Sequence, residues 1–94
     1  MKPRITLSID PNGELQIWLN ESGRDLFVRE LQALSTTSDH FHLGPENLDS
    51  EVPVQTIAYN EGDRVLDWGK VMIRTDDWDA RYYPHVLGKS ESAD

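Results

Sequence analysis

Two histidines, His40 and His42, are the residues whose type and spacing come nearest to a metal site. They stand two positions apart in an alternating segment, and such residues point to the same face of a strand. Metal sites use paired imidazoles of this kind, and Asp39, His85 or a loop carboxylate could supply a third ligand. The same alternation also places both rings on the solvent face of a strand whose other face is apolar. We favour this second interpretation and predict no metal site.

Acidic side chains are concentrated in the middle of the chain. The segment from Asp39 to Asp79 carries ten Asp or Glu residues against three Lys or Arg residues, and the 94-residue chain has a net charge of −8. Self-repulsion of this kind destabilises a compact domain, so the segment suggests a function that involves a basic partner. Nucleic acids and anionic lipids are disfavoured as partners, because both bind through Lys and Arg.

No set of residues has the spacing of a catalytic site. No serine lies in a G-x-S-x-G elbow, and the glycines are scattered singly rather than gathered in a phosphate-binding loop. The chain has no cysteine, which excludes thiolate nucleophiles and thiolate metal ligands. The acids Asp76, Asp77 and Asp79 lack the EF-hand pattern and are typical of a helix start. We therefore predict a protein that is not an enzyme and needs no cofactor.

Length and composition limit the architecture and the location. Ninety-four residues form one domain with one modest core. No apolar run reaches the 18 or so residues that a membrane span requires, so we expect no membrane contact. No apolar signal segment follows Met1, and the absence of cysteine fits a reducing compartment, so we expect a cytoplasmic protein.

The elements that must position these residues begin with a β-hairpin. Polar and apolar residues alternate over 4–10 and again over 14–19, and 11–13 supplies Pro, Asn and Gly for the turn. The residues predicted on the buried face of the second strand are Leu15, Ile17 and Leu19. Trp18 is predicted on the opposite face. One covered sheet face needs a second layer, which the following segment provides.

That second layer is predicted to be a helix capped by Asn20 or Ser22. Phe27, Leu31 and Leu34 recur at helical spacing and form the stripe expected to pack on the sheet. Hydroxyl side chains over 35–38 compete for backbone hydrogen bonds and end the helix.

The second half of the chain predicts further strands and a short helix. Phe41 and Leu43 should point inward from the third strand, and Trp78 and Tyr82 should pack the short helix on the sheet. The predicted elements are a strand at 39–43, a loop at 44–53, a strand at 54–59, a turn at 60–63, a strand at 64–74 with a bulge near Gly69, and a short helix at 77–82 that is capped by Thr75 or Asp76 and ended by Pro84.

Together these elements predict an α+β fold. We expect an antiparallel sheet of four to five strands, with one main helix packed on one face and a short C-terminal helix. Residues 1–88 should form a single domain, and residues 89–94 a flexible C-terminal tail.

Two stretches of the chain resemble small bacterial immunity proteins of polymorphic toxin systems, and the immunity protein 32 family in particular. The first runs from Gly13-Glu14-Leu15 through Asn20-Glu21-Ser22-Gly23-Arg24-Asp25-Leu26 and Arg29-Glu30-Leu31 to Asp39-His40-Phe41-His42-Leu43. The second is Trp78-Asp79 followed by Tyr83-Pro84-His85-Val86-Leu87. The resemblance implies a protein that inhibits a cognate toxin by binding it and so protects the producing cell. It brings no catalytic residues with it.

The acidic segment suggests where such a toxin would bind. A nuclease-like toxin presents a basic site, and an acidic protein can occupy it, with complementary charge speeding association. Tyr59 and Trp68 are the candidate anchors, because Tyr and Trp are enriched in interfaces. The predicted partner-binding residues are Glu46, Asp49, Glu51, Tyr59, Glu61, Asp63, Asp67 and Trp68.

Two other functions fit the same sequence. One is a regulatory or scaffold module that binds a protein other than a toxin. The other is a metal-dependent enzyme built on His40 and His42. The sequence leaves open the oligomeric state, the identity of the toxin, and whether inhibition blocks an active site or acts at a distance.

Overall fold

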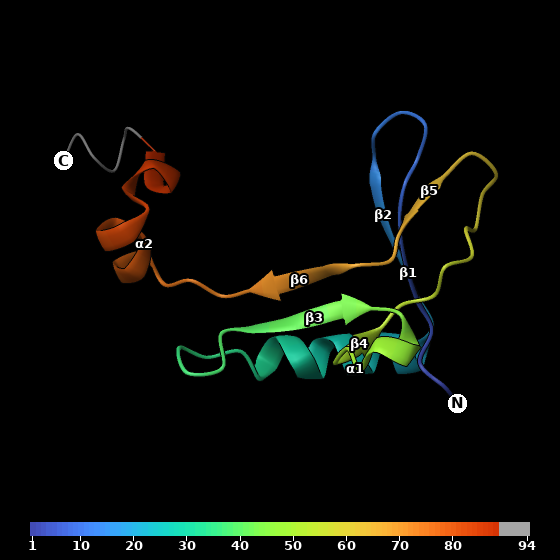
Figure 1. The fold of residues 1–94 in the computed structure, drawn as a ribbon, viewed down its shortest axis with the longest axis horizontal. Coiled ribbons are helices and arrows are strands. Elements are labelled where there is room, and N and C mark those ends of the chain that lie inside the picture. The colour runs from blue at the N-terminus through green and yellow to red at the C-terminus, as the bar shows by residue number, and fades with distance from the viewer. Residues whose placement is uncertain (89–94) are drawn as a thin grey trace.

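The chain folds into two small sheets and two α-helices, seen in a computed structural model that describes residues 1–88 (Figure 1). The tail predicted over 89–94 lies outside the described residues. The elements are β1 (Ile5–Ile9), β2 (Leu15–Leu19), α1 (Glu21–Gln32), β3 (His40–Gly44), the 3-10 helix η1 (Glu46–Leu48), β4 (Val52–Pro53), β5 (Arg64–Leu66), β6 (Gly69–Met72), α2 (Asp76–Tyr82) and the 3-10 helix η2 (Pro84–Leu87). The fold is α+β, as predicted.

The predicted N-terminal hairpin is confirmed. β1 and β2 pair antiparallel, with Leu7 opposite Ile17. The Asp10 carboxylate accepts hydrogen bonds from the backbone N–H groups of Asn12 and Glu14, both at 2.9 Å, and so holds the turn. β5 adds to the other edge of β1, which gives the strand order β2–β1–β5.

The prediction of one antiparallel sheet is wrong. The second sheet has the order β4–β3–β6, in which β3 pairs antiparallel with β6 and parallel with β4. The strand predicted at 64–74 is divided between the sheets, because β5 joins β1 and β6 joins β3. The chain changes sheet at Asp67 and Trp68, close to the register shift that the sequence indicates at Gly69.

Helix α1 is fixed at its start by its N-cap. The Asn20 side-chain oxygen accepts hydrogen bonds from the backbone N–H of Gly23 at 2.7 Å and of Arg4 at 2.9 Å, so one residue ties the helix to the segment before β1. Gly23 is buried there, and a Cβ at this position would lie 2.5 Å from the Arg4 carbonyl oxygen. The helix can approach the strand this closely because residue 23 has no side chain.

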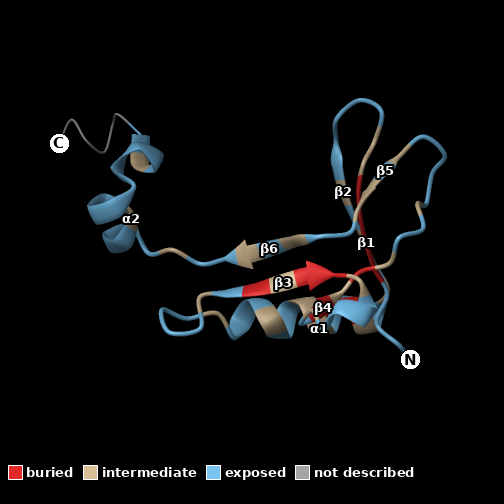
Figure 2. Cartoon of the chain, viewed as in Figure 1, coloured by how far each residue is buried: buried red, intermediate tan, exposed pale blue. Residues whose placement is uncertain are grey.

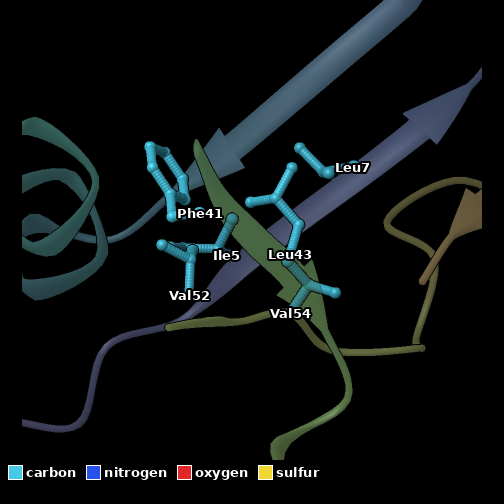
Figure 3. Close-up of a cluster of buried hydrophobic side chains, with 6 residues drawn as sticks. All are labelled: Ile5, Leu7, Phe41, Leu43, Val52 and Val54. Atoms are coloured by element: carbon cyan, nitrogen blue, oxygen red, sulfur yellow. The ribbon is translucent and has the colours of Figure 1, made fainter. Parts of the chain in front are cut away.

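The core lies between β1 and β3 and is closed by the segment after β4 (Figure 3). Its buried apolar residues are Ile5, Leu7, Phe41, Leu43, Val52 and Val54. Phe41 and Leu43 point inward as predicted. The strand predicted at 54–59 is not formed, and β4 covers only Val52–Pro53. The residues after it connect the two sheets instead, because the Val54 N–H bonds the Gly44 carbonyl at 2.8 Å and the Gln55 N–H bonds the Ile5 carbonyl at 2.9 Å.

The second strand of the hairpin does not bury its apolar side. Leu15, Ile17 and Leu19 are 56, 48 and 40 % exposed, although Leu7 and Ile5 on the neighbouring strand are buried (Figure 2). The reason is the position of α1, which packs Leu26, Phe27 and Leu34 against the core beside β3 and leaves the edge strand β2 open. Leu31, which the sequence places in the packed stripe, is also exposed.

The last described segment, residues 75–88, is a C-terminal arm that stands away from the two sheets (Figure 1). Thr75 caps α2 by accepting a hydrogen bond from the Trp78 N–H at 3.1 Å, and the helix ends at Tyr82, as predicted. Trp78 and Tyr82 do not pack on a sheet, because both are exposed and α2 packs mainly against η2. The molecule is correspondingly elongated, with extents of 47 × 33 × 22 Å. Neither described helix has the length and apolar character that crossing a membrane requires.

Candidate protein-binding site

The side of the β3–β6 pair that points away from the core carries polar and aromatic side chains. Residues opposite each other in antiparallel strands share a face, so His42 lies beside Lys70 and His40 beside Met72. Phe41 and Leu43 alternate to the other side and enter the core. We call this surface the outer face and define it as Asp39, His40, His42, Glu51, Trp68, Lys70, Met72 and Arg74.

One end of the outer face is organised around Asp39. Its carboxylate lies 2.8 Å from His40 Nδ1 through one oxygen and accepts a hydrogen bond from Arg74 Nη1 at 2.8 Å through the other. The hydrogen bond with His40, and then that with Arg74, hold the pKa of Asp39 below its ordinary value. The Arg74 guanidinium in turn lies 5.2 Å from the centre of the Trp78 ring. Both carboxylate oxygens are therefore engaged within the chain.

Glu51 holds the middle of the face. Its Oε1 accepts a hydrogen bond from the backbone N–H of His42 at 2.7 Å and lies 3.5 Å from His42 Nδ1. The backbone hydrogen bond is the main reason that the pKa of Glu51 is lowered. The His40 and His42 rings meet edge to face with 5.0 Å between their centres. Two histidine–carboxylate pairs thus stand side by side, with both histidines on β3.

The geometry does not assemble a metal centre from these groups. Within residues 1–88, no three His, Asp or Glu side chains are close enough together to hold an ion. Asp39 is occupied by His40 and Arg74, and Glu51 is bonded to the backbone of β3. His85, the other predicted ligand, lies in η2 beside Tyr83. What the two histidines offer is a polar contact surface.

Trp68 is the most exposed large apolar side chain of the outer face. It is 63 % exposed, and its ring stacks over His42 at 6.0 Å between centres. Gly44 lies directly beneath it, because a Cβ there would come within 3.1 Å of the ring and 2.3 Å of Ser50 Oγ. The indole is therefore exposed and held in position, which is the combination expected of an interface anchor.

Tyr59, the second predicted anchor, lies on the other sheet. Its ring stacks on Trp18 with 4.3 Å between centres and 8° between planes. Trp18 belongs to β2 and points away from Leu15, Ile17 and Leu19, as predicted. Tyr59 is still half exposed, but its stacking fastens the loop before β5 to the first sheet. Tyr59 and Trp68 thus occupy separate surfaces.

The predicted acidic residues are likewise divided. Of these acids, only Glu51 bonds to the outer face. Glu46 forms an ion pair with Lys2 at 2.7 Å, on the rim of a hollow of about 400 Å³ lined by N-terminal residues and by residues 53–55. The remaining acids lie at turns, with Asp49 in a left-handed conformation after η1, Glu61 and Asp63 flanking Gly62, and Asp67 at the change of sheet. The acidic segment therefore lines several turns and is not one continuous patch.

Sequence reasoning missed the basic part of the outer face. Lys70 and Arg74 reach it through the pairing of β3 with β6 and through the bond to Asp39. The alternation of polar and apolar residues over 69–74 indicates a strand with Lys70 and Arg74 on one face, but it does not indicate which strand pairs with it. Comparison of the chain with protein-family models, with curated proteins and with solved structures finds no match.

Proposed function

We propose that this chain is an immunity protein, which binds and neutralises a cognate bacterial toxin by non-catalytic protein–protein contact in the cytoplasm of the producing cell. The observation that carries the proposal is Trp68, an exposed indole held between Gly44 and His42 on a face of charged side chains. Interfaces are enriched in Trp, Tyr, Met and Arg, and their strongest contributions come from positioned aromatic anchors.

Charge supports a basic partner. The chain carries a net charge of −8, so a nuclease-like toxin with a basic site would be attracted over a distance and would associate faster at low salt. The class of partner, a toxin, rests only on the sequence resemblance of residues 5–43 and 74–87 to immunity proteins, because charge alone does not supply it.

The arrangement of the outer face favours binding over catalysis. Its two carboxylates are each bonded to groups of the same chain, and its histidines each lie beside one of these carboxylates. Such pairing fixes the shape of a surface before the partner arrives, which lowers the entropy cost of association.

Co-expression with the toxin tests the proposal. The product of the gene next to that of this chain, the proposed toxin, is induced in a bacterial host together with this chain or with its Trp68→Ala variant. We expect the unaltered chain to restore growth and the variant to protect poorly at matched expression. Ile57→Ala is the control, because Ile57 is exposed in the loop after β4, outside the outer face. The proposal is wrong if the toxin is unaffected by the unaltered chain, or if the chain binds a protein unrelated to any toxin.

The role of charge is tested by two matched pairs of reversals. Glu46→Lys with Asp49→Lys changes the turn around η1, and Glu61→Lys with Asp63→Lys changes the turn before β5. Each pair alters the net charge by +4. Any difference between the two variants in the association rate at low salt therefore reflects the position of the charges and not their number. The pair nearer the toxin should slow association by about tenfold or more. Equal rates for both variants and the unaltered chain would remove the electrostatic part of the proposal.

A further inference from the structure

The exposed side of β2 is an apolar surface on an edge strand. Leu15, Ile17 and Leu19 stand opposite Ile9, Leu7 and Ile5, so all six share one face of the sheet. Ile5 and Leu7 on β1 are covered by the core, whereas the half on β2 is about half exposed. We call Leu15, Ile17 and Leu19 the β2 row. Three aliphatic side chains in line on an open edge strand form a surface that proteins normally cover.

The C-terminal arm carries a matching apolar surface. Trp78 and Tyr82 lie one turn apart on α2 with 4.6 Å between ring centres, and both are about half exposed. Tyr83 and Val86 extend the same apolar character into η2. A helix of seven residues is too short to be stable by itself, so its aromatic side needs something to pack against.

The accessible surface and the radius of gyration are both larger than those of a compact domain of this length, as expected if two apolar surfaces are left uncovered. The accessible surface of the whole chain is 6974 Å², whereas a compact monomer of 10.8 kDa exposes about 5,500 Å². The radius of gyration is 16.1 Å, against about 12 Å for a compact domain of this length. The difference in area, roughly 1,400 Å², exceeds the ~800 Å² that each partner buries in a standard interface.

The direction of the arm indicates whether it packs against the β2 row of its own chain or against that of another copy. Pairing with β3 continues past β6, because the Ile73 N–H bonds the Asp39 carbonyl at 2.9 Å and Arg74 bonds the Asp39 side chain. These contacts hold the chain straight as far as residue 74. The arm consequently leaves the body at the end of β6 that lies farthest from β2 (Figure 1).

We propose that two copies of this chain exchange arms, each arm packing Trp78 and Tyr82 on the β2 row of the other copy. The exchange is reciprocal, so a single two-fold axis closes the dimer and leaves no free arm or row. Trp78 lies beside Arg74 of the outer face, but the other outer-face residues are not part of this contact, and the dimer is proposed separately from the binding of a toxin.

Sedimentation equilibrium over a wide range of protein concentration tests the dimer. We expect a mass that rises with concentration to twice 10.8 kDa. Trp78→Ala in the arm and Ile17→Ser in the row should each raise the dissociation constant about tenfold or more, since both remove a central apolar contact. Ile57→Ala should leave it unchanged. A mass of 10.8 kDa at every concentration, or a dimer insensitive to both arm and row variants, overturns the proposal.

Engineered cysteines show which copy the arm contacts, since the natural chain has none. Single variants Ile17→Cys and Tyr82→Cys are mixed and mildly oxidised, and we expect a disulfide between the two chains. Ile57→Cys mixed with Tyr82→Cys is the control and should give little product. In the double variant Ile17→Cys/Tyr82→Cys, bonds between chains support arm exchange. A bond within one chain would show that the arm folds back on its own row, which contradicts the proposal.

Discussion

The outer face and the β2 row are both exposed, but they are built differently. On the outer face, Asp39 and Glu51 fix the two histidines, and Gly44 makes room for the ring of Trp68. On the β2 row, three aliphatic side chains stand open with no polar contact to position them. A surface held by specific contacts is ready for one partner, whereas a bare aliphatic row gains mainly from the removal of water. This difference is why we assign the first to a toxin and the second to another copy of the chain.

The largest effect on the free energy of unfolding is expected when the buried strand β1 is compared with its exposed neighbour β2. Ile5→Ala removes a side chain with no exposed surface and should lower the free energy of unfolding by about 2–5 kcal/mol. Ile17→Ala removes the same atoms from a half-exposed site and should cost less than about 1 kcal/mol at low protein concentration. Urea denaturation of both variants measures the difference. Equal losses would mean that the β2 row is covered within the monomer.

Gly23 tests how closely the helix must approach the body. Gly23→Ala places a methyl group 2.5 Å from the Arg4 carbonyl and should destabilise the fold by about 1–3 kcal/mol. Gly69→Ala is the matched control, because its nearest neighbour would be a side-chain carbon of Leu43 at 4.0 Å. Thermal unfolding of the two variants gives the comparison. A stable Gly23→Ala protein would show that α1 is not seated against β1 as described.

Removing the two helix caps one at a time tests whether the arm unfolds separately from the rest of the molecule. Asn20→Ala should lower the global free energy of unfolding by about 1 kcal/mol, because Asn20 caps α1 and also bonds Arg4. Thr75→Ala removes the equivalent bond to Trp78 but should only fray α2 at low protein concentration, since the arm barely contacts the body. Hydrogen exchange together with denaturation distinguishes local from global loss. A global loss from Thr75→Ala would contradict a separate arm.

The smallest effect is a pH dependence confined to the outer face. The pKa values of Asp39 and Glu51 lie below their ordinary values of 3.8 and 4.5, so both carboxylates stabilise the fold above those values. That contribution is lost as the pH falls through the lowered pKa values. Melting temperatures from pH 6 to pH 3 should therefore fall less steeply in Asp39→Asn/Glu51→Gln than in the unaltered chain. Identical slopes would mean that these bonds do not stabilise β3.

Local chemistry made much of the fold predictable. The hairpin, the Asn20 cap, the inward Phe41 and Leu43 and the Thr75 cap all depend on neighbours in the sequence. The division into two sheets was not predictable, because alternation indicates a strand but not its pairing partner. The same limit explains the β2 row. Its pattern correctly gives one apolar face, but whether that face is covered depends on where α1 packs.

The candidate site was predictable only in part. Trp68 and Glu51 were identified from aromatic and acidic character, and the structure brings both beside His42. Tyr59 and the other acids were grouped by closeness in sequence, yet turns place them on different surfaces. Charge along a chain becomes a surface property only after the loops are folded, which a single sequence does not specify.

The affinity of the complex with the toxin tests the central claim most directly. Trp68 and Tyr82 are both exposed aromatic residues, one on the outer face and one on the arm. Titration calorimetry with the purified product of the gene next to that of this chain, the proposed toxin, compares Trp68→Ala with Tyr82→Ala. We expect Trp68→Ala to weaken binding by about 30-fold or more, as loss of an interface anchor does, and Tyr82→Ala to leave it nearly unchanged. Equal affinities, or a greater loss from Tyr82→Ala, would show that the outer face is not where the toxin binds.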